Sequence, residues 1–159
     1  MENDNIFLAV KAAVVALMGA YGAAFGWLGW LILAWVGCMV LDWISGSAAA
    51  AAKGNWSSAV ARAGIWHKGG MVVVVIVAAV ADCVLGMAVA HFPSLGVDYT
   101  VLVLPVILVW YIFTELGSIA ENATGMGANV PAWLTKLLAA GKQLAENQID
   151  LPDDTDHNL

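Results

Sequence analysis

The chain has 159 residues, of which 62% are hydrophobic and 11% are charged, and its mean hydropathy is +0.83. Soluble domains are about 45–50% apolar and about 25% charged, so a soluble chain of this length could not bury so much apolar surface. The formal net charge of −6 comes largely from acids near the two ends, and no basic field suited to nucleic acid is present. These values predict an integral membrane protein with one transmembrane domain.

Two apolar segments are expected in the first third of the chain, over residues 6–24 and 27–45, each long enough to cross a bilayer. The chain begins with acidic rather than basic residues, so the first segment is expected to be retained and not cleaved as a signal peptide. The Gly22–Gly26 spacing favours either a close helix–helix contact or a tight turn, and both interpretations predict a hairpin. Lys11 lies about one and a half turns into the first segment, where it is expected either to pair with Asp42 or Glu115 or to extend to the headgroups.

The stretch after residue 45 is polar and basic, and it is predicted to form a cytoplasmic connector. Three of the six Lys and Arg residues lie in or beside it, and positive residues are retained on the cytoplasmic side of a membrane. A serine can cap a short helix here, with basic side chains beside anionic lipid. The connector is interpreted as a topology anchor on the inner leaflet rather than a recognition site. Its marked residues are Lys53, Ser57, Ser58, Arg62 and Lys68.

Two further apolar segments are predicted over residues 70–91 and 99–120, joined by an outer loop without Lys or Arg. The third segment carries Asp82, the only acid near the middle of a span, on a face of small residues repeated every four positions. A charge in mid-bilayer costs about 2.5–3.5 kcal/mol, so Asp82 is expected to face protein or water. Pro105 is expected to kink the fourth segment. The predicted oligomerisation or lumen face consists of Ala78, Asp82, Gly86 and Ala90.

Polar side chains also gather at the cytoplasmic ends of the predicted spans. Glu115, Ser118 and Asn122 lie at positions i, i+3 and i+7, which places them on one helix face. For Asp42 and Glu115, a solvated interfacial position and a functional role are both open. The intramembrane polar residues are Lys11, Asp42, Glu115, Ser118, Glu121 and Asn122.

The region after the spans is predicted to contain a short helix and a tail. Residues 123–147 should form a cytoplasmic amphipathic helix that lies on the membrane or on a partner subunit, and residues 148–159 an acidic disordered tail. The predicted fold is therefore an all-α integral membrane protein. Its transmembrane domain over residues 1–122 consists of four helices in two hairpins, with both termini in the cytoplasm.

No arrangement of residues indicates an enzyme, a cofactor site or a metal site. His67 and His91 fall at membrane edges, and Ser57 and Ser58 have no evident catalytic partners. The two cysteines, Cys38 and Cys83, lie within apolar runs without metal-type spacing. They are interpreted as small buried hydrophobic side chains rather than as a disulfide or metal site.

Several short motifs occur in a characteristic order. Residues 42–46 read Asp-Trp-Ile-Ser-Gly, residues 53–58 Lys-Gly-Asn-Trp-Ser-Ser, residues 64–68 Gly-Ile-Trp-His-Lys, and residues 115–122 Glu-Leu-Gly-Ser-Ile-Ala-Glu-Asn. Over about residues 6–138 this ordered set resembles the phage lysis and toxin-secretion holin family of clostridial-type phages. The chain departs from that family in its abundance of Ala and Trp and in its acidic tail.

The resemblance implies a protein that accumulates in the bacterial inner membrane, oligomerises and opens lesions. Endolysin, or a toxin in related proteins, then leaves the cytoplasm. The implied partners are membrane lipid, further copies of the chain, and an endolysin that is coupled functionally without necessarily binding; no nucleic acid is implied. The residues alone leave two other classes open: a small oligomeric ion or proton channel with a relay through Asp42, Asp82 and Glu115, and a non-conducting structural membrane protein.

Overall fold

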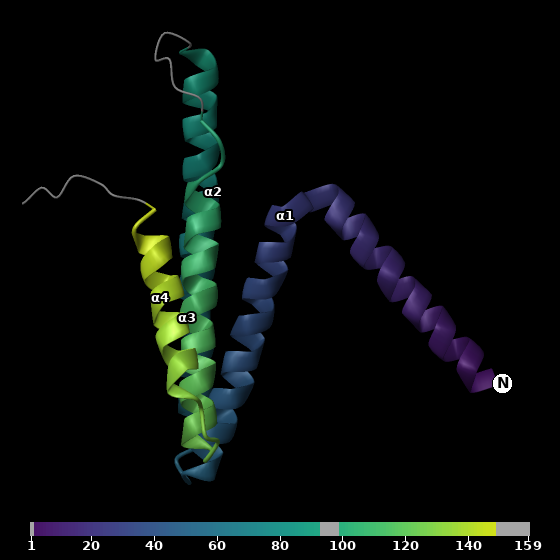
Figure 1. The fold of residues 1–159 in the computed structure, drawn as a ribbon, viewed down its shortest axis with the longest axis vertical. Helices are drawn as coiled ribbons and strands as arrows, with labels where there is room; N and C mark the ends of the chain where they lie inside the picture. Colours follow the sequence, from purple (N-terminus) through teal and green to yellow (C-terminus); the bar gives the residue numbers. More distant parts are fainter. Residues whose placement is uncertain (1, 93–98, 149–159) are drawn as a thin grey trace, which may run out of the picture.

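The computed structural model is a bundle of helices with one long helical arm (Figure 1). It describes residues 2–92 and 99–148, and for residues 2–5 and Val60 it describes the backbone alone. The helices are α1 (Glu2–Ala52), α2 (Ser58–His91), α3 (Val103–Gly125) and α4 (Ala132–Glu146), and no strand occurs in the described ranges. The predicted all-α fold is confirmed. The predicted outer loop at 93–98 and the acidic tail from residue 149 lie outside the described residues.

Helix α1 contains both of the first two predicted spans and bends between them at Gly26. This residue has φ 58° and ψ −152°, a backbone conformation that glycine adopts readily and other residues adopt only under strain. Residues 2–25, called the arm below, extend away from the remaining helices, which form the bundle (Figure 1). The predicted tight hairpin is therefore not found, and an open bend takes its place.

Bulky side chains fill the inner corner of this bend and explain why it is open. The Tyr21 hydroxyl donates to the backbone oxygen of Gly29 at 3.0 Å, and the Tyr21 and Trp30 rings meet edge-on with centroids 6.1 Å apart. A Cβ placed on Gly22 would lie 3.2 Å from the Trp30 ring, so the ring already rests against this glycine. These contacts hold the two halves of α1 apart.

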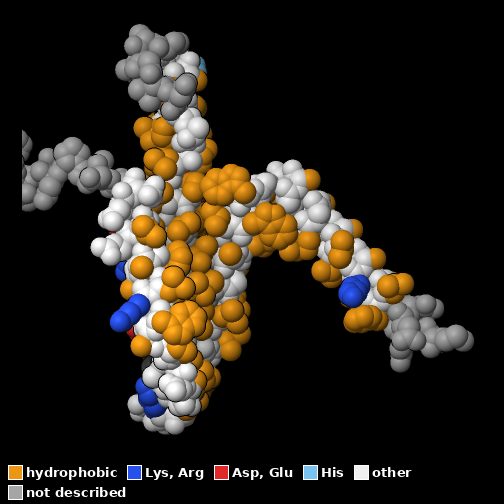
Figure 2. Space-filling model, viewed as in Figure 1, with side chains coloured by type: hydrophobic (Ala, Val, Ile, Leu, Met, Phe, Trp, Pro, Cys, Tyr) orange, Lys and Arg blue, Asp and Glu red, His pale blue; other side chains and the backbone are white. Residues whose placement is uncertain are grey.

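Among the described residues, three helices are long and apolar enough to cross a membrane: Ile6–Ala52, Ala61–His91 and Val103–Gly125. Their buried core is small for a chain of this size and consists of Trp35, Met71, Ala78, Leu104 and Leu108. Large apolar side chains such as Leu41 and Val73 are 57% and 59% exposed, and the space-filling view shows such side chains spread along the arm and the bundle (Figure 2). An apolar surface of this extent suits lipid rather than water.

Helix α4 lies within the predicted amphipathic segment 123–147, but the first three residues of that segment belong to α3 instead. Helix α4 lies beside α3 of the same chain (Figure 1), and its contact with the membrane or a partner subunit stays a prediction. Gly141 and Ala145, one turn apart, are its buried residues, and the Phe113 ring packs so closely on Gly141 that a Cβ there would clash. The Trp110 indole nitrogen also donates to Glu146 at 2.8 Å. Small residues that admit an aromatic ring from α3 therefore give α4 a docking site within its own chain.

Candidate functional site

Three charged side chains from three helices meet at the end of the bundle nearest the connector. The Lys68 ammonium of α2 lies 2.7 Å from the Asp42 carboxylate of α1 and also binds the Glu115 carboxylate of α3. These side chains are 15%, 17% and 3% exposed, respectively. One cation thus lies between two anions, and the ion pairs join all three long helices. A charge inside an apolar bundle is tolerated when it is paired in this way.

Two neutral side chains complete this group. The Asn122 amide donates to Asp42 Oδ1 at 3.0 Å and to the Ser45 hydroxyl at 3.1 Å, and Ser45 itself donates to the Asp42 backbone oxygen at 3.1 Å. Both carboxylate oxygens of Asp42 are therefore bound, one by Lys68 and the other by Asn122. The five residues are called the connector layer below: Asp42, Ser45, Lys68, Glu115 and Asn122.

The connector layer corrects two sequence-based predictions. Lys68 was assigned to a headgroup-level connector, but α2 begins at Ser58, so Lys68 lies well inside a helix and points into the bundle. Lys11 was expected either to pair with Asp42 or Glu115 or to extend to the headgroups. It lies on the arm, with its ammonium 5.6 Å from the centroid of the Phe7 ring. The pairing alternative is therefore wrong for Asp42 and Glu115 of the same chain, because Lys68 occupies that place.

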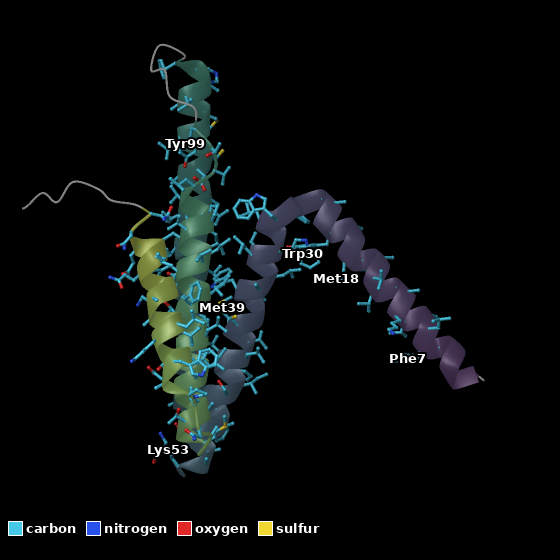
Figure 3. The ribbon with its side chains drawn as sticks, in the orientation of Figure 1. Phe7, Met18, Trp30, Met39, Lys53 and Tyr99 are labelled. Carbon is cyan, nitrogen blue, oxygen red and sulfur yellow. The ribbon has the colours of Figure 1, made fainter. Side chains whose placement is uncertain are left out.

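The remaining connector residues lie around this end of the bundle. The Lys53 ammonium is beside Gly125 at the C-terminus of α3, where a cation is favoured by the helix dipole, and Figure 3 shows Lys53 at this extremity. Ser58 begins α2, the Ser57 carbonyl accepts from the Ala61 amide at 3.1 Å, and Arg62 is exposed. These positions agree with a short polar turn between two helices.

Two of the predicted polar residues lie elsewhere. Ser118 and Glu121 line a groove of about 360 Å³ between α3 and α4, together with Lys142. They therefore share a helix with Glu115 and Asn122 but do not belong to the connector layer.

A second polar group lies near the opposite end of the bundle, where Asp82 of α2 meets the start of α3. Its Oδ1 atom accepts from the backbone amides of Leu102 and Val103 at 3.1 and 2.9 Å, and its Oδ2 atom accepts from that of Leu104 at 2.7 Å. The Tyr99 hydroxyl donates to the same carboxylate, and Figure 3 shows Tyr99 beside the far part of α2. These groups are called the cap layer below.

The cap layer provides a hydrogen-bond acceptor for every free backbone N–H group at the N-terminus of α3. The first backbone N–H groups of a helix have no partner within it, and α3 has no side-chain cap of its own at Leu102. Asp82 binds three of these donors, and the next residue is Pro105, which has no N–H to satisfy. The carboxylate also lies at the positive end of the helix dipole. In an apolar surrounding, where water cannot bind free amides, such a cap is strongly favoured.

This arrangement corrects the prediction that Pro105 kinks a span. Helix α3 begins at Val103 and not at residue 99, so the proline lies in the first turn. The first helical hydrogen bond, from Val106 to Leu102 at 3.2 Å, follows directly after it. A proline in this position removes no helical hydrogen bond and causes no kink.

The cap layer also bears on the small-residue face predicted for oligomerisation. Ala78 and Asp82 are 3% and 6% exposed and pack against α3 of the same chain. The contact between helices expected for Asp82 is therefore made within one chain. Gly86 and Ala90 lie farther along α2, and their role in association stays a prediction.

Tyr99 is affected electrostatically by the cap layer. Its hydroxyl donates to the Asp82 carboxylate, and this hydrogen bond raises the pKa of Tyr99 above its usual value. An ionised Tyr99 would place a second negative charge beside Asp82. The hydrogen bond therefore requires the neutral phenol.

An apolar slab separates the two layers. Lys68 and Asp82 are 14 positions apart on α2, which corresponds to about 21 Å of helix. The slab contains the buried core, in which Trp35 stacks on Tyr111 with ring centroids 6.2 Å apart. Since the hydrocarbon region of a bilayer is about 30 Å thick, both layers fall within or at its edges when the bundle spans it.

The site offers charge neutralisation and helix capping rather than reactive groups. Within residues 2–92 and 99–148, no group of three or more His, Cys, Asp or Glu side chains could hold a metal ion. Cys38 and Cys83 are both free; Cys38 is half-buried and Cys83 exposed, so the expected burial does not hold for Cys83. The fold and site define a helical membrane protein in which Asp42, Lys68, Glu115 and Asp82 are bound by groups of the same chain.

Comparison with known proteins identifies the group to which this chain belongs. The family model of the bacteriophage holin family matches residues 19–143, which include the bend, both polar layers and most of α4. The chain belongs to the bacteriophage holin family. A search of curated proteins found no match, and a search of solved structures found none.

Proposed function

We propose that this chain is a holin that accumulates in the bacterial inner membrane, associates with further copies, and opens lesions. Endolysin, or in a related setting a toxin, would leave the cytoplasm through them. The observation that carries the proposal is the family match over residues 19–143. The three long apolar helices, with their charged groups bound inside the bundle, support a membrane-resident chain.

The proposed topology has four crossings, with the arm and the second half of α1 each crossing once. Both termini then lie in the cytoplasm together with the basic connector, which the Lys and Arg distribution favours. In a variant without Cys38 and Cys83, a cysteine at position 94 should react with an impermeant thiol reagent in intact spheroplasts. Cysteines at positions 3 and 55 should not react. Labelling at position 3 would contradict a cytoplasmic N-terminus, and labelling at position 55 would invert the whole topology.

The bundle is suited to a protein that first accumulates and then assembles. Membrane helices fold as individual spans and associate afterwards, and here the carboxylates of both polar layers have hydrogen-bond partners within one chain. Newly inserted chains would therefore be stable as monomers. Their exposed arms and apolar faces remain available for association when the chain reaches a high density in the membrane.

The test is co-expression with an endolysin that lacks its own export signal, while culture turbidity and membrane potential are followed. Wild-type chain should give a delay, then abrupt lysis with loss of potential. The chain without endolysin should collapse the potential but leave the wall intact, and endolysin alone should do neither. Accumulation in the membrane without lysis would overturn the proposal. An ion-selective current without passage of endolysin would favour a channel instead.

A further inference from the structure

The arm carries Lys11, whose ammonium binds no carboxylate among the side chains that the structure describes. Every side chain from Ile6 to Ala20 is exposed, and Lys11 contacts the Phe7 ring alone among the interactions described for it. An ammonium group at this depth is costly against lipid unless it is paired or reaches the headgroups. From residue 6 to residue 25 the arm is thus an apolar helix with one cation, and it extends away from the other described helices.

The direction in which Lys11 points can be read from the bend. Gly22 rests against the Trp30 ring and therefore faces the inside of the bend. Lys11, Val15 and Met18 precede Gly22 by 11, 7 and 4 positions and share its helix face. Figure 3 shows Met18 and Phe7 along the arm and Trp30 at the corner. Lys11 therefore lies on the side of the arm that faces the bundle.

Closing the arm onto its own α1 would not pair this lysine. The face of α1 that carries Trp30 continues through Gly37 and Leu41, at 7 and 11 positions farther along, and it is apolar. Asp42 points away from this face and into the connector layer. A closed hairpin would therefore bury Lys11 against apolar side chains without a partner.

A groove along the seam between α1 and α2 offers a better match. It has a volume of about 380 Å³ and an almost entirely apolar lining that includes Val36, Val40 and Val72, with Lys68 as the one charged residue of the lining. Another cavity, of about 160 Å³, is lined by Asp42 and Lys68 on the same seam. The ion-paired group there contains two carboxylates and one ammonium, so it carries an excess negative charge when ionised. An apolar helix with a single cation is complementary to this seam.

The distances of Lys11 and Asp42 from the bend at Gly26 agree with docking of the arm in this groove. Lys11 precedes Gly26 by 15 positions and Asp42 follows it by 16, which are about 22 and 24 Å of helix. Val15 and Val36 are likewise 11 and 10 positions from the bend. When two copies lie in the membrane in the same orientation, their bends are level. Lys11 of one copy is then at the depth of Asp42 of the other.

We propose that the arm of one copy docks in the α1–α2 groove of a second copy, where its Lys11 neutralises the Asp42–Lys68–Glu115 group. This inference rests on the proposed function, since it names the surface through which the copies associate. Reciprocal exchange gives a two-fold dimer, whereas passing the arm on to a third copy gives a ring or an open chain. The arm then exchanges lipid contacts for helix contacts, and its charge is paired.

Cysteine crosslinking tests the contact directly. In a background without Cys38 and Cys83, Val15→Cys and Val36→Cys are placed on two differently tagged copies, co-expressed in the membrane and oxidised. A disulfide-linked heterodimer is expected. The matched control pairs Val15→Cys with Gly37→Cys, which is at the same depth but on the face that an intramolecular hairpin would use, and where a Cβ meets open space. A Val15–Gly37 crosslink, within or between copies, or the absence of any crosslink overturns the proposal.

A charge variant tests the role of Lys11. Lys11→Met should lower the Val15–Val36 crosslink yield about threefold, the size expected of an average polar contact between membrane helices. Lys11→Arg should preserve it. In an Asp42→Asn background, where the excess charge is gone, Lys11→Met should have little further effect. An unchanged yield in Lys11→Met, or an equal fall in both backgrounds, overturns the charge match.

The lysis assay is run in parallel on the cysteine-free chain, so the two proposals can fail separately. Lysis without the Val15–Val36 crosslink would retain the holin function and reject arm exchange. The crosslink without lysis would retain arm exchange and reject the holin function.

Discussion

The connector layer and the cap layer are two solutions to the same problem, the placement of acids inside an apolar bundle. In the connector layer, Asp42 and Glu115 share the side chain of Lys68 as their cation, and the ion pairs join three helices. In the cap layer, Asp82 has no basic partner and is held by backbone amides at the N-terminus of α3 together with one phenol. The connector layer is stabilised by a formal positive charge, whereas the cap layer is stabilised by the backbone amides at the N-terminus of a helix.

This difference predicts different sensitivities to mutation. In the connector layer the cation is essential, because its loss leaves two carboxylates without compensation. In the cap layer the acid itself is essential, but its loss exposes only neutral amides. A single substitution should therefore cost more in the connector layer than in the cap layer.

The largest effect is expected for Lys68→Met. Removing one partner of a buried ion pair costs about 3–5 kcal/mol, and here two carboxylates lose the same cation. The free energy of unfolding, measured by denaturant titration in mild detergent, should fall by that amount. Lys136→Met, on an exposed position of α4, is the control and should change little.

A rescue variant sharpens this test. Lys68→Met combined with Asp42→Asn and Glu115→Gln removes the charges together and should recover most of the lost stability. If Lys68→Met alone were as stable as wild type, the ion pairs would contribute nothing and the comparison between the layers would fail.

Asp82→Ala should have the next largest effect. Three amides of α3 would lose their acceptor, with a cost of about 1–3 kcal/mol in the free energy of unfolding. Hydrogen exchange at residues 102–104 should accelerate more than exchange in the middle of α3. Asp82→Asn keeps one acceptor oxygen, so its free energy of unfolding should lie between those of Asp82→Ala and wild type. Glu121→Ala, at an exposed position of α3, is the control. Uniform acceleration along α3 would argue against a local cap.

Much of the fold was predictable because it depends on local apolar runs. The sequence predicted α-helices and long apolar segments, and Asp42 and Glu115 were both among the residues singled out. The partner of these acids was misassigned. Lys68 is adjacent to glycines and a histidine, which favoured a connector, whereas α2 in fact begins at Ser58.

The other errors came from contacts between residues far apart in the chain. The expected hairpin at Gly26 depends on what fills the inner corner, and the Trp30 ring there favours an open bend. The cap by Asp82 could be deduced only by knowing that α3 begins 21 positions later at Val103 and not at residue 99. Neither periodicity nor hydropathy contains this information.

Asn122→Ala tests the neutral part of the connector layer. The variant loses the bonds to Asp42 and Ser45, but the Lys68 ion pair remains, so the loss should be about 0.5–1.5 kcal/mol in the free energy of unfolding. Asn147→Ala, at the exposed C-terminus of α4, is the control. A loss as large as that of Lys68→Met would mean that hydrogen bonding, rather than charge, dominates the connector layer.

Tyr99→Phe should have the smallest effect at neutral pH, and its signature is a dependence on pH. The hydrogen bond to Asp82 raises the pKa of Tyr99 above its ordinary value of 10.0. A raised folded-state pKa means that the stabilisation is fully present below pH 10 and is lost as the pH rises through the raised value. The difference in free energy of unfolding between wild type and Tyr99→Phe should therefore be constant in the neutral range and shrink above pH 10.

Tyr21→Phe, which removes a hydroxyl bound to the Gly29 carbonyl and not to a carboxylate, is the matched control. A constant difference between wild type and Tyr99→Phe through the alkaline range would show that Asp82 is held by the amides of α3 alone.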